Sequence, residues 1–176
     1  MPDETVVLID DKGTVQKEFL RQEAHQKGFL HSIVVVYLFD KKGNILIQQR
    51  MDRRFDHSAA GHVDKGETYR QAAIRELTEE IGVSGVELMD LGMSTSREVH
   101  PERNKDIYHV FKIFGCNAEP GILQDTEVKK VFWANPYETY KETQKDPKEK
   151  KYTGGFRESL KFVLKDSTFK NYFISL

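Results

Sequence analysis

The positions of hydrophobic and polar residues along the chain predict a mixed α/β protein. Residues 33–39 (IVVVYLF) form a nearly continuous apolar run, which is typical of a strand buried on both faces. Residues 44–50 (NILIQQR) follow after a turn, so the two runs predict a β-hairpin. Residues 67–81 carry apolar side chains at helical spacing and are followed by Gly82, which predicts one strongly specified helix in the middle of the chain.

Weaker patterns predict the remaining elements. We expect further strands at residues 5–9, 14–17, 86–93, 107–114 and 128–134. We expect helices at residues 136–143 and 156–165, and a weak helix or loop at residues 19–27. Residues 51–65 and the polar segment 94–106 are expected to be loops.

Composition narrows the class of protein. The 176 residues suit one domain with an N-terminal hairpin or extension (1–28), a core (29–143), a charged linker (144–153) and a C-terminal helix (154–176). The chain has 27 Lys and Arg against 28 Asp and Glu, so it lacks the basic excess of a dedicated nucleic-acid binder. This balance is compatible with a small anionic substrate that a few local charges bind. The single cysteine, the acidic N-terminus and the lack of an apolar run of about 20 residues predict a cytoplasmic protein without a membrane span.

Three glutamates on the predicted central helix form a candidate metal site. Glu76 and Glu80 are four residues apart and lie on one face, and Glu79 borders that face. Because the opposite side carries Ala73 and Leu77, we expect the acids to face out of the core. Carboxylates packed this closely repel one another unless a cation neutralises them, and oxygen ligands favour a hard ion such as Mg²⁺ or Mn²⁺. The alternative is a solvated acidic face without a metal.

The segment 61–83, GHVDKGETYRQAAIRELTEEIGV, resembles the Nudix box. That box consists of glycine, five residues, glutamate, seven residues, and then Arg-Glu-aliphatic-x-Glu-Glu-x-Gly-aliphatic. Its fixed positions are filled here by Gly61, Glu67, Arg75, Glu76, Leu77, Glu79, Glu80, Gly82 and Val83. The resemblance implies an α/β/α sandwich with a mixed β-sheet and a loop–helix–loop catalytic motif.

The resemblance also implies a reaction, the hydrolysis of a nucleoside diphosphate linked to another group by a metal-activated water. The ligands of Mg²⁺, or of Mn²⁺ in its place, would be Glu76, Glu79, Glu80 and the carbonyl of Gly61. Glu67 and Arg75 look like the pair that braces the motif. The expected catalytic residues are Glu76 and Glu79, with Glu79 as the first candidate for general base. Because the base varies among Nudix enzymes, the reserve candidates are Glu98, Glu102 and Asp106.

Substrate contacts are expected from residues outside the box. Arg50, Arg53 and Arg54 lie just before its loop and would meet phosphate oxygens, with a solvated basic cluster as the alternative. Glu98 and Asp106 in the segment 94–106 are further candidates for substrate binding. These residues do not identify the substrate, so nucleoside di- and triphosphates, nucleotide sugars and short prenyl diphosphates all stay open.

The flanks of the box resemble the isopentenyl-diphosphate isomerase branch of the same superfamily. The segments HQKGFLHSIVVVYLFDKKGNILIQQR and FDHSAAGHVDKGE carry this resemblance. That isomerase holds a metal with histidines, and His31 and His62 fall at matching positions, while His25 falls near a third. A hydrogen-bonded structural histidine is the alternative for each. The isomerase also needs a cysteine where this chain has Ala60, and we therefore favour hydrolysis over isomerisation.

Two other functions stay open beside these. A catalytically silent Nudix module would bind a nucleotide without cleaving it, but such modules usually show a damaged box, whereas all three glutamates are intact here. Hydrolysis of an RNA cap would be favoured by a basic surface, which the balanced charge does not provide.

Nudix proteins are often homodimers, and the sequence leaves the oligomeric state open.

Overall fold

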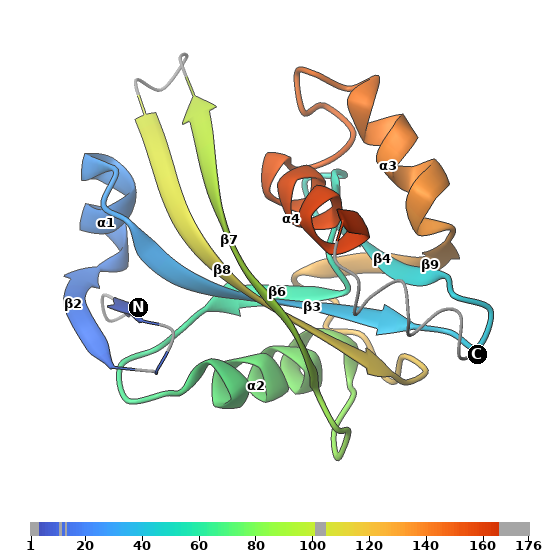
Figure 1. Cartoon of the computed structure of the whole chain (residues 1–176), viewed down its shortest axis with the longest axis horizontal. Coiled ribbons are helices and arrows are strands. Elements are labelled where there is room, and N and C mark those ends of the chain that lie inside the picture. The colour runs from blue at the N-terminus through green and yellow to red at the C-terminus, as the bar shows by residue number, and fades with distance from the viewer. Residues whose placement is uncertain (1–3, 11, 13, 101–104, 166–176) are drawn as a thin grey trace.

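The computed structural model describes residues 4–10, 12, 14–100 and 105–165, without the side chains of residues 98–100, 105 and 106. Runs of strands are separated by single helices along this part of the chain, and two helices end it (Figure 1). The strands are β1 (Thr5–Ile9), β2 (Val15–Leu20), β3 (His31–Phe39), β4 (Ile45–Arg50), β5 (Phe55–Asp56), β6 (Ala59–His62), β7 (Met89–His100), β8 (Lys105–Asn117) and β9 (Val128–Ala134). The helices are α1 (Arg21–Lys27), α2 (Tyr69–Ile81), α3 (Pro136–Gln144) and α4 (Gly154–Lys165).

The larger sheet mixes parallel and antiparallel strands around β3. Its path runs β5-β4-β3-β8-β7, with β6 paired to β3 and β9 paired to β4, while β1 and β2 form a separate hairpin. β3 and β8 run parallel, which sets His31 opposite His109. β3 pairs with β4 at its last residue, Phe39, whereas its earlier residues 33–36 pair with β6. This division of the sheet places the short strand β6 beside the centre of the fold.

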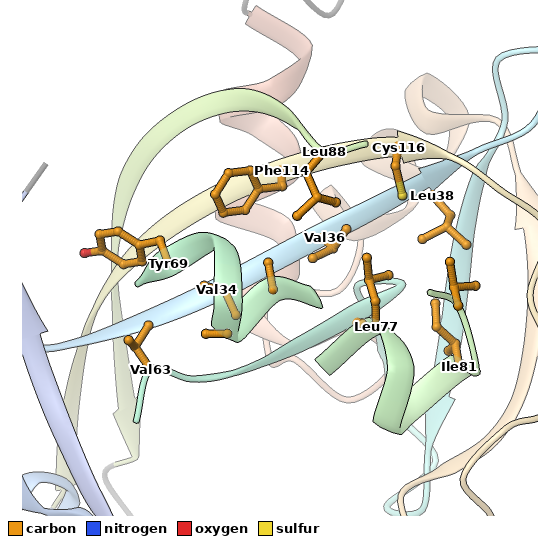
Figure 2. Packing of buried hydrophobic residues seen from close by; sticks show 14 of the residues in the cluster. Val34, Val36, Leu38, Val63, Tyr69, Leu77, Ile81, Leu88, Phe114 and Cys116 are labelled. Atoms are coloured by element: carbon orange, nitrogen blue, oxygen red, sulfur yellow. The ribbon is translucent and has the colours of Figure 1, made fainter. Parts of the chain in front are cut away.

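β3 is buried on both faces, as its apolar run predicts. Because side chains alternate across a strand, this one strand supplies two cores. Val34, Val36 and Leu38 pack in the cluster that includes α2 (Figure 2). Val35 and Tyr37 point the other way and pack in the cluster that includes α4. The helices α2 and α4 therefore cover opposite faces of the sheet (Figure 1), and the expected α/β/α sandwich with a mixed β-sheet is confirmed.

The central helix begins two residues later than its periodicity predicts. Thr68 is the N-cap of α2 and forms a capping box with Gln71, each side chain bonding the other residue's backbone N–H. Gly82 ends the helix in the left-handed conformation at φ 66°, which glycine adopts without steric cost. Glu67 therefore lies in the loop before the helix, where its carboxylate is available to other partners.

The sequence pattern misses several strand boundaries. The segment 94–106 was expected to be a loop, but β7 and β8 continue into it as a long antiparallel ribbon (Figure 1). Residues 51–65 were also expected to be a loop, but they contain β5 and β6, whose few residues are too short to show an alternating pattern. Residues 19–27 divide between the end of β2 and α1. No helix in the described parts of the chain has the length and apolar character needed to cross a membrane.

Candidate active site

A cavity of about 410 Å³ brings the residues of the box together with three other groups of side chains. Glu76, Glu79 and Glu80 of α2 line it together with Gly61 of β6. Histidines from α1, β6 and β8 line it as well, and arginines come from β4 and from the turn that follows. The loop before β9 and the segment that leads into α4 complete the wall. The cavity is therefore built from elements that are distant in sequence.

Arg75 joins α2 to the loop that precedes the helix. Its guanidinium donates to both carboxylate oxygens of Glu67, at 2.8 and 2.9 Å, and to the backbone carbonyl of His62 at 3.0 Å. These hydrogen bonds lower the pKa of Glu67, so its carboxylate stays ionised. The structure thus brings together the two residues expected to brace the motif, and their paired contacts hold the loop against the helix.

Glu76 and Glu80 face into the protein, so the expectation that the acids face out of the core is wrong for these two. Glu80 is 5% exposed and Glu76 is 9% exposed, whereas the side chain of Glu79 is 54% exposed. The reason lies in β6, where Ala60 and Gly61 leave room for carboxylates against the strand. A Cβ atom at Gly61 would lie 2.0 Å from Oε1 of Glu76, so this position has to be glycine if the carboxylate is to stay in place.

Glu80 is a buried carboxylate that takes its hydrogen bonds from neutral groups. Its Oε2 accepts from the backbone N–H of Ala60 at 3.1 Å and from the side-chain amide of Gln48 at 3.3 Å. None of the ion pairs among the described residues includes Glu80. Burial, with the charge of Glu76 adding to it, raises the pKa of Glu80 to about 8. Burial also raises the pKa of Glu76, even though Arg75 donates to its Oε1 at 2.6 Å.

This set of oxygen atoms fits a hard divalent cation. Glu127, from the loop before β9, lines the same cavity, and its charge raises the pKa of Glu76 and of Glu80 further. Negative charge is therefore in excess where these carboxylates meet. Mg²⁺ and Mn²⁺ prefer carboxylate and carbonyl oxygens, which are the atoms that Glu76, Glu80 and the backbone of Gly61 offer.

The three arginines before the box divide into two groups. Arg50 and Arg54 line the cavity, whereas Arg53 does not and instead occupies a turn at φ 73°. Arg50 contacts Asp56 at 3.2 Å and Asp52 at 3.8 Å, and Arg54 contacts Asp52 at 2.9 Å. Arg50 and Arg54 are thus placed to meet a substrate, but each already has a carboxylate partner.

The remaining acidic candidates lie on β7 and β8 or in the segment of the sequence between these strands. Glu98 is on β7 and Asp106 is on β8, and the side chains of both lie outside the description. Glu102 falls in the segment 101–104, which also lies outside it. Their roles in substrate binding or as a base therefore stay predictions.

Four histidines converge next to the box. His25, His31, His62 and His109 each place one ring nitrogen within 4.8 Å of the others. Burial lowers the pKa of His31, of His62 and of His109, the last to about 3, which keeps these rings neutral. Sequence reasoning assigned nothing to His109, because its approach to His31 depends on the parallel pairing of two strands that are far apart along the chain.

A chain of buried polar side chains that begins at the wall of the cavity, with Asp56 and His57, was also missed. Nδ1 of His57 lies 2.7 Å from Oδ1 of Asp56, and Nε2 lies 2.6 Å from the hydroxyl of Ser159. The Ser159 hydroxyl also lies 2.7 Å from that of Tyr37, which links α4 to β3. Ser159 is 0% exposed, so a substrate cannot reach it, and its hydroxyl donates to the carbonyl of Phe156. Its role is therefore structural.

The chain matches a known protein family over most of its length. Residues 29–154 match the NUDIX domain family. An uncharacterized Nudix hydrolase of Yersinia pestis is 29% identical over 143 residues, which are 77% of this chain and 75% of that protein. An isopentenyl-diphosphate Delta-isomerase of Pectobacterium atrosepticum is 36% identical over 89 residues, which are 47% of this chain and 50% of the isomerase. The crystal structure of DR0079 from Deinococcus radiodurans has a TM-score of 0.69 at 20% identity, covering 90% of this chain and 97% of that one.

The chain therefore belongs to the Nudix family, and the resemblance seen in the box is confirmed. The expected class of enzyme, a Nudix pyrophosphohydrolase, is confirmed with it. Relatives named as isopentenyl-diphosphate isomerases agree with the resemblance of the flanks, although the matched stretch spans about half the length of those proteins. The metal, the substrate, the cytoplasmic location, the oligomeric state and the role of each site residue stay predictions.

Proposed function

We propose that this protein uses Mg²⁺ to hydrolyse the diphosphate linkage of a nucleoside diphosphate derivative or of a related small phosphorylated metabolite. The observation that carries the proposal is the state of Glu80, a buried carboxylate beside Glu76 whose hydrogen bonds come from neutral donors. Two adjacent buried carboxylates are destabilised when both are ionised, and a divalent cation is the partner that would offset this cost. The intact box of a confirmed Nudix family member supports the same conclusion.

The residues of the site divide the work between holding the cation and handling the proton. When bound, the cation would neutralise phosphate oxygens and lower the pKa of a water molecule. Glu76, Glu80 and the carbonyl of Gly61 would hold it, because these atoms lie on the inner side of α2 and β6. Glu79 is exposed on the same helix and would accept the proton of the attacking water as the P–O bond of the diphosphate breaks.

Arg75 is a positioning residue in this scheme. It contacts Glu67, Glu76 and Glu79, at distances from 2.6 to 3.3 Å. One guanidinium thus orients a metal-binding carboxylate and the proposed base, while Glu67 fixes the guanidinium itself. The fork geometry of arginine allows these contacts at once, which the single ammonium of lysine would not.

The structure disfavours isomerisation as the second candidate function. The isomerase resemblance requires a cysteine at position 60, and Ala60 lines the cavity there. Cys116 does not take its place, because it is buried in the core cluster beside α2. Burial also raises the pKa of the Cys116 thiol to about 11, which keeps the thiol protonated.

Turnover of a defined panel tests the proposal. The purified protein would be incubated with Mg²⁺ and with nucleotides, nucleotide sugars and prenyl diphosphates, while released phosphate and pyrophosphate are measured. We expect one class to be hydrolysed, with activity lost on chelation and in Glu76→Gln, which also excludes a contaminating hydrolase. Binding without turnover across the panel would contradict the proposal and favour a silent nucleotide-binding module.

A further inference from the structure

We propose that His57 is a positioning residue, which holds the Asp56 carboxylate and through it keeps the Arg50 guanidinium in place to bind a phosphate group of the substrate. This role rests on the proposed function in that a phosphorylated ligand occupies the cavity, but it does not require that ligand to be cleaved. His57 belongs to no motif of the sequence, and its contact with Ser159 of α4 exists only in the folded chain.

Arg50 lines the cavity and has N–H groups to spare. Its Nη1 donates to Oδ2 of Asp56 at 3.2 Å, while Asp52 lies 3.8 Å from Nε, beyond hydrogen-bond distance. A guanidinium has five N–H groups, so these two contacts leave donors for phosphate oxygens. Although burial opposes it, neighbouring carboxylates, first Asp56 and also Glu80, raise the pKa of Arg50. The guanidinium is therefore cationic and lies near the acidic residues of the box.

Asp56 is the residue that fixes this guanidinium. Its Oδ1 accepts from the backbone N–H of His57 at 2.9 Å and from the hydroxyl of Thr153 at 2.9 Å, and Nδ1 of His57 lies 2.7 Å away. These contacts leave Oδ2 turned toward Arg50. The Asp56 side chain is 9% exposed, against 47% for Arg50. The buried carboxylate therefore sets the position of the more exposed guanidinium.

The ring of His57 is itself held by its surroundings. It is 3% exposed, and its Nε2 lies 2.6 Å from the hydroxyl of Ser159. Three aromatic rings stand at 69° to 81° to it, with centroids 5.4 to 6.1 Å away, and these belong to Tyr37, Phe111 and Phe156. Side chains packed on all sides cannot rotate freely. His57 thus transmits the position of α4 to Asp56.

Backbone pairing brings the start of α4 to the same place. The N–H of Phe55 donates to the carbonyl of Lys151 at 2.8 Å, and the carbonyl of Phe55 accepts from the N–H of Thr153 at 3.0 Å. Phe55 directly precedes Asp56 on β5. The C-terminal helix therefore influences the arginine side of the cavity through Asp56, without a substrate contact by Ser159.

Binding of a diphosphate analogue that cannot be hydrolysed tests this role. The affinity of the full chain for methylenediphosphonate in Mg²⁺ would be measured by isothermal titration calorimetry. We expect His57→Leu to raise Kd by about tenfold, less than the about 100-fold that a misplacement of 1 Å costs. In an Arg50→Met background the same substitution should have no further effect, because residues that act through one another are not additive. An equal loss in both backgrounds would overturn the proposal, and so would a wild type that does not bind the analogue.

His57→Asn separates position from charge. The amide nitrogen of asparagine takes the place of Nδ1, so this variant keeps a donor toward Asp56 but carries no positive charge. We expect it to recover most of the affinity that His57→Leu loses, and a loss as large as in His57→Leu would overturn the proposal. If His57→Leu does not fold, Ser159→Ala takes its place in the same two backgrounds.

Tyr37→Phe is the matched control, because it removes a buried hydroxyl that contacts Ser159 and not Asp56. We expect lower stability and an unchanged Kd in this variant. A Kd raised as much as in His57→Leu would attribute the loss to general destabilisation and overturn the proposal. Absence of turnover, with the expected pattern of Kd values, would remove the proposed hydrolysis and leave the role of His57 intact.

Discussion

The backbone N–H of Ala60 donates a hydrogen bond to Oε2 of Glu80 across 3.1 Å, which joins β6 to α2 inside the cavity. The same position is where the isomerase resemblance requires a cysteine. Ala60 therefore occupies the place of an expected catalytic thiol and at the same time supports a buried carboxylate of the hydrolase box. The residue at position 60 therefore bears on whether the protein hydrolyses or isomerises its substrate.

We expect Ala60→Cys not to create isomerase activity. A thiol at this position would supply one of the two proton-transfer groups that isomerisation needs. The isomerases that the flanks resemble also use a pair of acidic residues downstream, where this chain has Asn104 and Asp106, and the amide of Asn104 cannot donate or accept a proton as a carboxyl does. The measurement is the formation of the allylic diphosphate from isopentenyl diphosphate. Detectable product would show that the resemblance to the isomerases extends to their chemistry.

Gly61→Ala should reduce activity strongly while the protein stays folded. The added Cβ would lie 2.0 Å from Oε1 and 2.2 Å from the carboxyl carbon of Glu76, so that carboxylate has to move. A displacement of about 1 Å in a catalytic group lowers kcat/KM by about 100-fold. Steady-state kinetics over a range of Mg²⁺ concentrations would measure both the loss and any weaker activation by the metal.

Gly85→Ala is the control for this substitution. Gly85 has φ 68° and nothing within 4 Å of its Cβ position, so alanine there adds backbone strain of about 1 kcal/mol without touching the site. We expect lower stability and unchanged kcat/KM in this variant. Similar kinetics in the Gly61 and Gly85 variants would mean that the approach of Glu76 to β6 does not matter for turnover.

Glu79→Gln should lower kcat by about 10²- to 10⁴-fold, because the amide keeps the size of the side chain but cannot accept a proton. The exposed position of Glu79 predicts an unchanged fold, which circular dichroism would verify. Glu138→Gln on α3 is a matched exposed control, and it should have wild-type activity. Turnover close to wild type in Glu79→Gln would move the role of base to Glu98 or Asp106.

The sequence predicts elements whose pattern is long and one-sided. The apolar run of β3 and the helical spacing of α2 identify both elements, and Gly82 marks the end of the helix. β5 and β6 could not be found this way, because two and four residues do not complete an alternating pattern. β7 and β8 were underestimated because their ends are polar and are held by backbone pairing.

Part of the candidate site could be predicted from spacing within one helix, and the rest depends on contacts between residues that are far apart in the sequence. The spacing of Glu76 and Glu80 identifies their shared helix face, but the helix alone does not reveal that Ala60 and Gly61 lie opposite it. His109 meets the other histidines through strand pairing, which no local spacing encodes. The contact between His57 and Ser159 spans 102 residues for the same reason.

Asp56→Asn should destabilise the protein through the buried polar chain that begins at the wall of the cavity. Asp56 is 6% exposed and contacts His57, Arg50 and the hydroxyl of Thr153. Although burial opposes its ionisation, these contacts lower the pKa of Asp56 below its ordinary value of 3.8. Removal of one partner of a buried ion pair costs about 3 kcal/mol. We expect a loss of that size at pH 7 by urea unfolding, with little change for the exposed Asp52→Asn.

The pH dependence of that loss distinguishes the charge of Asp56 from its packing. A carboxyl whose pKa is lower in the folded state stabilises the fold at pH values above its unfolded pKa, and this contribution disappears as the pH falls toward the folded pKa. The difference in unfolding free energy between wild type and Asp56→Asn should therefore be full at neutral pH and shrink as the pH drops below 3.8. A difference that stays constant down to pH values where the wild type unfolds would attribute the effect to packing and hydrogen bonding, and would remove the ion pair as the cause.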